Sequence, residues 1–312
     1  MESSAIEATG LMKHYGDTYA VSELGLTIPE GMFFGLLGPN GSGKTTTIHM
    51  LSTLVRPDAG TIRVAGCDVL KEPVKARGSI GLVFQESALD GSLTVEENLN
   101  FAGALYDLST DLIQQRCNEL LTLFDLEDKR HTRVSALSGG MRRAVDIARG
   151  VLHRPSVLFL DEPTIGLDII NRRSIWRFIG RLRQEHGTTV LLTTHYLEEA
   201  ESCDSVAFLR RGSLIGQGRP TDLIQDLAAY ILELESNQPE HYIKELSSSL
   251  GTPVREGERL LFAIQDADFQ FGEWQQRLQQ EVRSLQLRKP DLNDVYIWRN
   301  QPDSATASGE SS

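Results

Sequence analysis

The chain has 312 residues, a length that typically divides into about two domains. Apolar residues make up 40% and charged residues 24%, close to globular averages, which excludes wholesale disorder and collagen-like repeats. Lysine and arginine number 31 against 43 aspartates and glutamates, so the net charge is −12. A chain this acidic has little capacity for broad contact with phosphates, and we expect no nucleic acid partner.

Apolar runs, the first residues and the cysteines bear on the compartment. The apolar runs, such as residues 32–37 and 157–160, are far shorter than the roughly 20 residues of a membrane-spanning helix. The start, MESSAIEATG, lacks the basic and apolar regions of a secretory signal. Three distant cysteines disfavour both a disulfide framework and a zinc site. Together these features predict a cytoplasmic, reduced protein.

Strand patterns open the chain. Residues 18–37 alternate and then become apolar, with a turn signal at 29–31, which indicates strands. A glycine-rich segment follows over residues 38–45. Residues 45–55 then predict a helix that ends before the turn residues 57–60.

The middle of the chain combines helices with two apolar runs. Residues 92–150 are mostly helical in pattern, and we expect an inserted helical subdomain at about 92–150. Short apolar runs follow at 156–163 and 188–195, with a helical pattern between them. Such runs are typical of strands buried on both faces of a parallel sheet. The expected fold class is therefore α/β.

Composition changes after residues 216–220, where we place a domain boundary. Residues 1–220 form the main domain. Beyond it, a β-α-β-α-β pattern predicts a small accessory α/β domain over residues 221–300. The five segments of this accessory domain are residues 230–236, 239–250, 258–266, 271–282 and 284–289. Residues 301–312 are polar and small, and we expect a disordered tail.

A phosphate-binding loop is the strongest motif, because residues 38–45 fit G-x-x-x-x-G-K-[ST]. Glycines let backbone N–H groups cradle phosphates, Lys44 can reach the β- and γ-phosphates of a nucleotide, and the Thr45 hydroxyl can bind Mg²⁺. The alternative, a glycine turn with an exposed lysine, is disfavoured by the strand before and the helix after it. The candidate nucleotide contacts are Gly38, Pro39, Asn40, Gly41, Ser42, Gly43, Lys44, Thr45 and Thr46.

Two carboxylates end the apolar run of residues 157–160. A buried strand that delivers Asp161 to the carboxyl edge of the sheet would place it beside the phosphates, where it can hold Mg²⁺, in part through water. Glu162 would face the other way and could orient or deprotonate the attacking water. A helix cap or an exposed acidic pair is the structural alternative.

Residues 136–143, ALSGGMRR, bring the chain close to a known family. The segment resembles the LSGGQ signature of ABC-type ATPases and stands before the Asp161-Glu162 strand, as it does in that family. Ser138, Gly139 and Gly140 would begin a helix and leave N–H groups for a phosphate. The resemblance implies that they serve ATP bound to a second copy of the domain. Taken alone, the segment would be better explained as a helix N-cap with glycine spacers.

The remaining motifs of the family occur in order. Tyr15 matches the aromatic that stacks on adenine, and Gln85 matches the glutamine that links Mg²⁺ and water to the helical subdomain. Asp168, in EPTIGLD, matches the loop that contacts the other protomer, and His195 matches the switch histidine at the γ-phosphate. Each has an ordinary structural explanation when taken alone. The full order implies a P-loop NTPase of the ABC cassette type, with ATP and Mg²⁺ as cofactors.

The residues within and around these motifs resemble those of the daunorubicin-resistance type of exporter ATPase. GLLGPNGSGKTT, DEPTIGLD and the C-terminal PDLNDVYIW carry this likeness. One departure is Met141, where the wider family usually has glutamine; we expect it to tune activity rather than abolish it, because backbone amides and Ser138 do most of the phosphate binding.

The resemblance implies how the protein works. Two copies sandwich two ATP molecules, each between one Lys44 loop and the opposite Ser138 loop, and hydrolysis of ATP releases the closed dimer. This motion would drive a separate transmembrane permease that exports a drug-like or other hydrophobic compound. The ATPase would lie on the inner face of the cell membrane, and its charge of −12 favours docking to protein over anionic lipid. Residues 93–99 are the candidate docking segment; covering their own core is the alternative.

Other classes fit the sequence less well. A translation-associated or regulatory ABC ATPase without transport is the main alternative, although translation-associated members normally carry two cassettes and one lysine loop occurs here. A chromosome-maintenance ATPase would need long heptads between the lysine loop and the signature. A protein kinase is excluded because its glycine loop has a different lysine arrangement. A GTPase is disfavoured because the sequence contains nothing that resembles a guanine-reading motif.

Overall fold

The computed structural model describes residues 3–278 and 282–301. The predicted tail at 301–312 lies, apart from residue 301, outside the described residues. The chain divides into two compact units, the first of residues 1–196 and 203–214, the second of residues 197–202 and 215–312.

An antiparallel sheet in the order β2-β1-β4-β5 opens the first unit. β1 and β2 pair along most of their length, and a turn at residues 30–32 leads from β2 to the next strand. The inward residues of both strands, among them Ile6, Leu11 and Ile28, are fully buried. The strands are β1 Ser4–Tyr15, β2 Thr18–Pro29, β4 Ala59–Val64 and β5 Cys67–Asp68.

A second, six-stranded sheet has the order β10-β9-β3-β8-β7-β6. The pairs β3 with β8, β3 with β9, β7 with β8, and β6 with β7 are parallel, so the carboxyl ends of these strands meet at one edge. β3, β7 and β8 are buried along their whole length, which explains their continuous apolar runs. The strands are β3 Phe33–Leu37, β6 Ile80–Val83, β7 Val157–Asp161, β8 Thr189–Thr194, β9 Ser205–Arg210 and β10 Ser213–Gly218.

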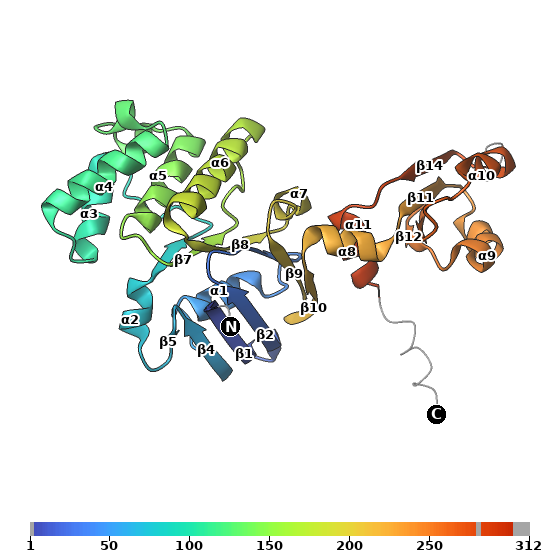
Figure 1. Cartoon of the computed structure of the whole chain (residues 1–312), viewed down its shortest axis with the longest axis horizontal. Coiled ribbons are helices and arrows are strands. Elements are labelled where there is room, and N and C mark those ends of the chain that lie inside the picture. Colours follow the sequence, from blue (N-terminus) through green and yellow to red (C-terminus); the bar gives the residue numbers. More distant parts are fainter. Residues whose placement is uncertain (1–2, 279–281, 302–312) are drawn as a thin grey trace. The chain divides into compact units, whose positions relative to one another are not determined.

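Helices of the first unit lie between and beside these strands (Figure 1). α3, α4 and α5 form a helical group with α6 beside it, on the opposite side of the parallel strands from the antiparallel sheet. Two short 3₁₀ turns, Glu127–Lys129 and Val134–Ala136, connect α4 to α5. The helices are α1 Lys44–Leu51, α2 Pro73–Gly78, α3 Val95–Leu105, α4 Thr110–Leu123, α5 Gly139–Val151 and α6 Ile169–His186.

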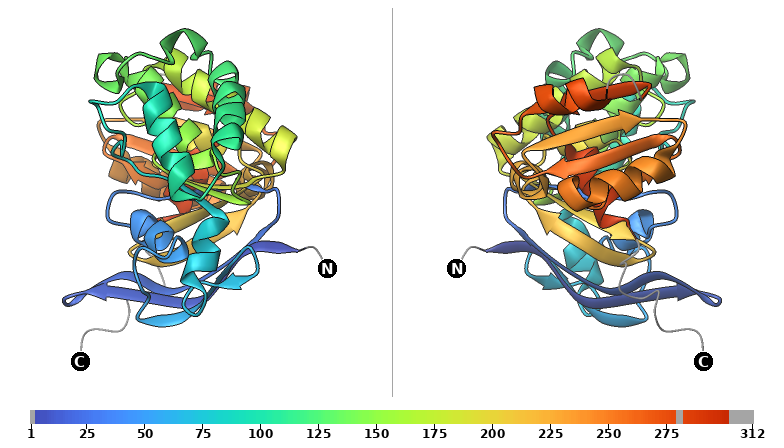
Figure 2. Two further views of the ribbon diagram at one scale, coloured as in Figure 1. Left: turned by 90° about the vertical axis from the view of Figure 1, so that its left-hand side faces the viewer. Right: turned by 90° about the vertical axis from the view of Figure 1, so that its right-hand side faces the viewer.

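The second unit is built on an antiparallel sheet in the order β12-β13-β11-β14, whose strands can be followed in the right-hand view of Figure 2. α9 and α10 cover one face, where Tyr242, Leu246 and Leu278 are buried with Phe262. Ile297 and Trp298 of α11 pack on the other face. The elements are α7 Leu197–Ala200, α8 Pro220–Leu227, β11 Tyr230–Glu235, α9 Pro239–Leu250, β12 Val254–Glu256, β13 Arg259–Ile264, α10 Phe271–Leu278, β14 Ser284–Arg288 and α11 Leu292–Arg299.

The structure differs from the sequence prediction in one helix end and in two strands. The helix predicted for residues 45–55 ends at Leu51, because Ser52 caps it and Thr53 takes a left-handed conformation with φ of 71°. The strands at 4–15 and 59–64 were not predicted. Within the described residues, no helix is both long and apolar enough to cross a membrane.

Candidate active site

The loop between β3 and α1 owes its path to its glycines. Gly38, Gly41 and Gly43 have φ of 159°, 79° and 108°. A Cβ on Gly43 would lie 2.4 Å from the Ala20 carbonyl oxygen, and one on Gly38 would lie 2.5 Å from that of Leu209. These positions therefore require glycine. The loop ends at the N-terminus of α1, where free N–H groups and the helix dipole favour an anion.

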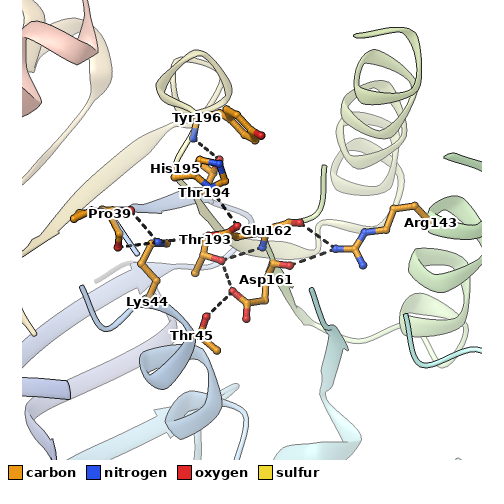
Figure 3. A network of polar contacts seen from close by, with 11 residues as sticks. Pro39, Lys44, Thr45, Arg143, Asp161, Glu162, Thr193, Thr194, His195 and Tyr196 are labelled. Atoms are coloured by element: carbon orange, nitrogen blue, oxygen red, sulfur yellow. Dashed lines mark hydrogen bonds and ion pairs between the residues drawn. The ribbon is translucent and has the colours of Figure 1, made fainter. Parts of the chain in front are cut away.

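Lys44, the first residue of α1, lies against the loop that precedes it. Its ammonium donates hydrogen bonds to the carbonyl oxygens of Gly38 (2.8 Å) and Pro39 (3.2 Å). It also lies 3.5 Å from Glu162 Oε1, and both side chains are buried. A cation is thus held where the loop and the end of β7 meet (Figure 3).

Asp161 is the last residue of β7 and joins two hydroxyl groups. Thr45 Oγ1 donates to Asp161 Oδ1 at 3.2 Å, and Thr193 Oγ1 donates to the same oxygen at 2.5 Å. Thr193 pairs with Asp161 in the register of β7 with β8. The two strand ends and the start of α1 therefore converge on one carboxylate.

Glu162 follows directly and is held in a strained backbone conformation. Its φ of 45° is uncommon for a residue other than glycine, and such strain often marks a functional site. The Glu162 N–H donates to both the carbonyl oxygen (3.2 Å) and Oγ1 (3.0 Å) of Thr193. Its Oε2 lies 3.1 Å from Nδ1 of His195. The carboxylate is thereby fixed between Lys44 on one oxygen and His195 on the other.

A cavity of about 340 Å³ opens beside these groups. It brings together the phosphate loop, Gln85 and Glu162, as the sequence predicts for one site. Asp161 reaches the same place through its contact with Thr45. The lining residues are Ala20, Asn40, Gly41, Gly43, Lys44, Thr45, Thr46, Gln85, Glu162 and Ile165.

Tyr15 is not among the residues that line this cavity. It ends β1, pairs with Thr18 at the hairpin and is 53% exposed. Asp58, just before β4, fixes the same end of β1, because it accepts hydrogen bonds from the Lys13 side chain and the His14 backbone. These bonds lower the pKa of Asp58 to about 2. The predicted stacking of Tyr15 on adenine remains a prediction.

The residues expected to act on a second copy also lie outside the cavity. Ser138 caps α5, its Oγ accepting a hydrogen bond from the Met141 N–H at 3.2 Å. Asp168 caps α6 and accepts hydrogen bonds from both the backbone and the side chain of Asn171. Met141 lines a separate cavity of about 190 Å³ with Asn171 and Ser174 of α6. The contacts of Ser138, Gly139, Gly140 and Asp168 across a dimer remain predictions.

Sequence reasoning missed two residues of this region, Thr193 and Arg143. Arg143 is 8% exposed and donates hydrogen bonds to carbonyl oxygens at Asp161, Glu162 and Pro163. A signal was present, since Arg143 lies on the apolar stripe of α5 with Ile147 and Val151. For Thr193 the signal depends on strand register, which the sequence alone does not provide.

Donor chemistry at Asp161 fits a magnesium ion bound together with a nucleotide. Mg²⁺ prefers oxygen ligands and is usually held by one or two carboxylates with phosphates and water. Asp161 and Thr45 supply a carboxylate and a hydroxyl in contact with each other. Among the described residues no group of three His, Cys, Asp or Glu side chains could hold a metal without such help.

Comparison with known proteins agrees with this geometry. The ABC transporter family profile matches residues 21–165. The chain is 39% identical to the daunorubicin/doxorubicin resistance ATP-binding protein DrrA of Streptomyces peucetius, covering 94% of this chain and 91% of that protein. It is 37% identical to the Nod factor export ATP-binding protein I of Rhizobium sp. (strain N33), covering 95% and 97%.

Solved structures share the cassette. The cbiO1 subunit from Clostridium perfringens, part of the transporter complex cbiONQ, is 27% identical with a TM-score of 0.67, over 80% of this chain and 96% of that chain. A dimeric, post-hydrolysis cassette, MJ0796 bound to ADP and Pi, is 28% identical with a TM-score of 0.63, over 69% and 98%.

Fold and site thus define a P-loop ATPase of the cassette type, and the predicted α/β fold class is confirmed. The chain belongs to the family of ABC transporter ATP-binding subunits, which bind and hydrolyse ATP to power transport. The predicted likeness to the daunorubicin-resistance group is confirmed as well. Subunits of this family act with membrane permeases and form dimers.

Proposed function

We propose that the protein hydrolyses MgATP at the cavity beside Lys44 and so energises export of a drug-like hydrophobic compound. The observation that supports it most is the convergence of Lys44, Glu162 and the Thr45–Asp161 pair at one edge of the parallel sheet. Lys44 and the loop N–H groups bind the phosphates. Glu162 takes the proton of the attacking water, and His195, at 3.1 Å, orients its carboxylate.

Thr45, Asp161 and Gln85 are the residues that would hold Mg²⁺. The ion would neutralise charge on the β- and γ-phosphates when bound. Asp161 is kept in position for this task by the Thr193 hydroxyl, and Gln85 reaches the same cavity from the strand end of β6.

A second copy of the chain would complete each site. Ser138, Gly139, Gly140 and Asp168 lie at the N-termini of α5 and α6, where backbone N–H groups favour an anion. None of the four lines the cavity of its own chain, which suits a role toward the ATP of the partner. Tyr15 would stack on the adenine.

The permease would dock on α3. Within the predicted segment 93–99, Val95, Asn98 and Leu99 are buried, so these residues cover their own core. Farther along the same helix, Phe101 and Leu105 are 61% and 67% exposed. An exposed apolar pair on a helix suits an amphipathic cytoplasmic segment of a membrane protein. Docking there would keep the subunit on the inner face of the membrane.

The substrate class rests on the relatives. Relatives similar over nearly their full length include daunorubicin and doxorubicin resistance ATP-binding proteins and Nod factor export ATP-binding proteins. The names of the first group concern resistance to drugs, and we therefore favour a drug-like hydrophobic compound. Transport of a fluorescent drug-like compound into membrane vesicles that contain both subunits tests this proposal, and absence of ATP-dependent uptake would refute it.

Two substitutions test the site. Glu162→Gln is expected to retain ATP binding, to lose most steady-state hydrolysis and to trap a closed dimer, seen by size-exclusion chromatography with ATP. Hydrolysis at the wild-type rate would show that Glu162 is not the base. Lys44→Ala is expected to weaken MgATP binding strongly, and unchanged affinity would count against the phosphate loop.

Docking is tested separately. Phe101→Asp with Leu105→Asp is expected to abolish co-purification with the permease while leaving ATP binding intact. Leu54→Asp, at another exposed apolar residue of the first unit, is the matched control. Equal loss of co-purification in the control would place the docking surface elsewhere.

A further inference from the structure

Arg143 is a buried arginine one helical turn into α5, the helix that begins at the signature residue Ser138. Its guanidinium donates to four backbone carbonyl oxygens. The bonds are Nε to Pro163 (2.7 Å), Nη1 to Phe84 (2.5 Å), and Nη2 to Asp161 (3.3 Å) and Glu162 (3.4 Å). Figure 3 shows Arg143 reaching the segment that carries Asp161 and Glu162.

These carbonyls belong to the two segments that carry the hydrolytic groups. Phe84 directly precedes Gln85, and three of the four oxygens lie on residues 161–163. Glu162, the middle residue of that segment, has the strained φ of 45°. Thr193 holds its N–H from one side, and Arg143 holds its carbonyl from the other. A strained peptide persists only when its surroundings fix it in this way.

The charge of Arg143 is compensated within the same region. Asp146, one turn farther along α5, has Oδ2 3.6 Å from Nη1, and Arg149 lies 3.4 Å from its other oxygen. Burial lowers the pKa of Arg143 and raises that of Asp146. Arg143 Nη1 also donates to the Phe84 carbonyl oxygen, just before Gln85. α5 is therefore bonded to both strand ends by one network.

We propose that Arg143 is a positioning residue for hydrolysis, which fixes the peptides of Glu162 and Gln85 to the helix that carries Ser138. The inference rests on the proposed function, in which Glu162 is the base. A movement of α5, as when Ser138 engages a second copy, would then be passed to the geometry of the base and of Gln85. The chemistry that α5 influences is the attack of water, not the binding of ATP.

Geometry makes arginine specific here. A planar fork of five N–H donors can serve carbonyls on two segments at once, whereas the lysine ammonium is a single compact group on a flexible stem. Arg143→Lys keeps a positive charge beside Asp146 and removes the fork. A displacement of about 1 Å at a catalytic group can cost on the order of 100-fold in rate.

The test compares Arg143→Lys with Arg149→Met in the full chain. Arg149 also pairs with Asp146 but has no bond to residues 161–163 among those found in the described residues. We expect Arg143→Lys to lower kcat by about 10- to 100-fold with KM for MgATP within about twofold, and Arg149→Met to keep both within about twofold. ATP-induced dimerisation of Arg143→Lys in a Glu162→Gln background should persist.

Three results would overturn the inference: wild-type kcat in Arg143→Lys, a raised KM with unchanged kcat, or an equal loss of kcat in Arg149→Met. Should Arg143→Lys be unstable, Arg143→Gln with Asp146→Asn leaves no uncompensated charge and must show the same loss of kcat. Wild-type hydrolysis in Glu162→Gln would instead refute the proposed base, so the two failures are distinguishable.

Discussion

At the scale of single residues, the site depends on one hydroxyl that bonds both the Asp161 carboxylate and the Glu162 backbone. Thr193 donates to Asp161 Oδ1 at 2.5 Å, and its Oγ1 accepts from the Glu162 N–H at 3.0 Å. The residue is fully buried, so water cannot substitute for either bond. Both acidic groups therefore depend on β8 for their orientation.

Replacement of Thr193 by valine tests this dependence. The shape is preserved, but Asp161 and Glu162 each lose one bond, so we expect kcat for ATP to fall at least about tenfold with little change in ATP affinity. Thr189→Val is the control, since Thr189 is a buried threonine at the opposite end of β8. Wild-type kcat in Thr193→Val would show that the hydroxyl is dispensable.

A second residue-scale prediction concerns pH. His153 stacks on Tyr106 with ring centroids 3.7 Å apart, and its Nε2 lies 2.9 Å from the Ile80 carbonyl oxygen. Burial lowers its pKa to about 4. Above about pH 6.5 the His153 imidazole is mostly neutral in both the folded and the unfolded chain. Below about pH 6.5 the imidazole becomes protonated in the unfolded chain but stays neutral in the folded chain. Its stabilising contribution is therefore lost as pH falls from 6.5 through 4.

The free energy of unfolding should fall by on the order of 2 kcal/mol over this pH range, after discounting for the partial exposure of His153. His153→Phe keeps the stacking and removes the titration, so its free energy of unfolding should vary less between pH 7 and pH 4.5. His131→Gln, at an exposed histidine, should behave as wild type. The free energy of unfolding is measured by urea denaturation and followed by Trp176 fluorescence. Trp274→Phe and Trp298→Phe remove the other two tryptophans from the chain used. An unaltered pH dependence in His153→Phe would contradict the assignment.

Individual residues differ in how far the sequence reveals them. Lys44, Thr45, Asp161 and Glu162 could be placed because their chemistry follows from position beside a local strand or helix end. Thr193 and the fork of Arg143 could not, since their partners are set by the pairing of β7 with β8 and by the packing of α5.

At the scale of elements, α5 and α6 meet closely at the signature. A Cβ on Gly140 would lie 2.1 Å from Asn171 Oδ1 and 2.8 Å from Nδ2. Asn171 is itself held by Asp168 at the start of α6. Gly140 is thus required for packing within one chain, in addition to any role toward a second copy.

Gly140→Ala should push the two helices apart and cost about 1–3 kcal/mol of unfolding free energy. Gly139→Ala has no atom within 4 Å of its new methyl group and should be neutral or slightly stabilising. Asn171→Ala in the Gly140→Ala background should restore part of the loss. Thermal unfolding followed by Trp176 on α6 measures these changes. Equal stability of the two single variants would exclude the clash.

Elements also show where pattern reasoning works. β11, α9, β13 and β14 fall within about two residues of their predicted limits, because each combines clear periodicity with flanking turn residues. β1 and β4 were missed for different reasons. In β1 the adjacent residues Ala5 and Ile6 are both buried and bulges shift the register, so the alternation is broken. In β4 two of the six residues are buried, so its apolar signal is weak.

At the scale of the whole molecule, the chain enters the second unit directly after the site. Residues 197–202 follow His195 and Tyr196, belong to the second unit and form α7, which packs against α11. α11 is the segment LNDVYIWR. Its start is fixed by a capping box between Asp291 and Asp294 and by a bidentate bond from Arg288 to Asp294, at 2.6 and 2.8 Å.

Asp294 is fully buried, and these bonds account for the PDLNDVYIW likeness in physical terms. The bonds to Asp294 and Glu233 raise the pKa of Arg288 further. α11 is therefore connected to His195 in two steps: it packs on α7, and α7 follows His195 and Tyr196 in the chain. Loosening α11 should disturb the residue that orients Glu162.

Arg288→Met tests this link in the full chain. Loss of the guanidinium leaves a buried carboxylate without its cation, which typically costs about 3–5 kcal/mol. We expect the unfolding transition seen by Trp298 to shift to lower temperature and kcat for ATP to fall about two- to fivefold at constant KM. Arg283→Met removes an arginine paired with Glu258 at the surface and should change neither quantity by more than experimental error. If Arg288→Met loosens α11 while kcat stays at the wild-type value, α11 and α7 stabilise the second unit without acting on His195.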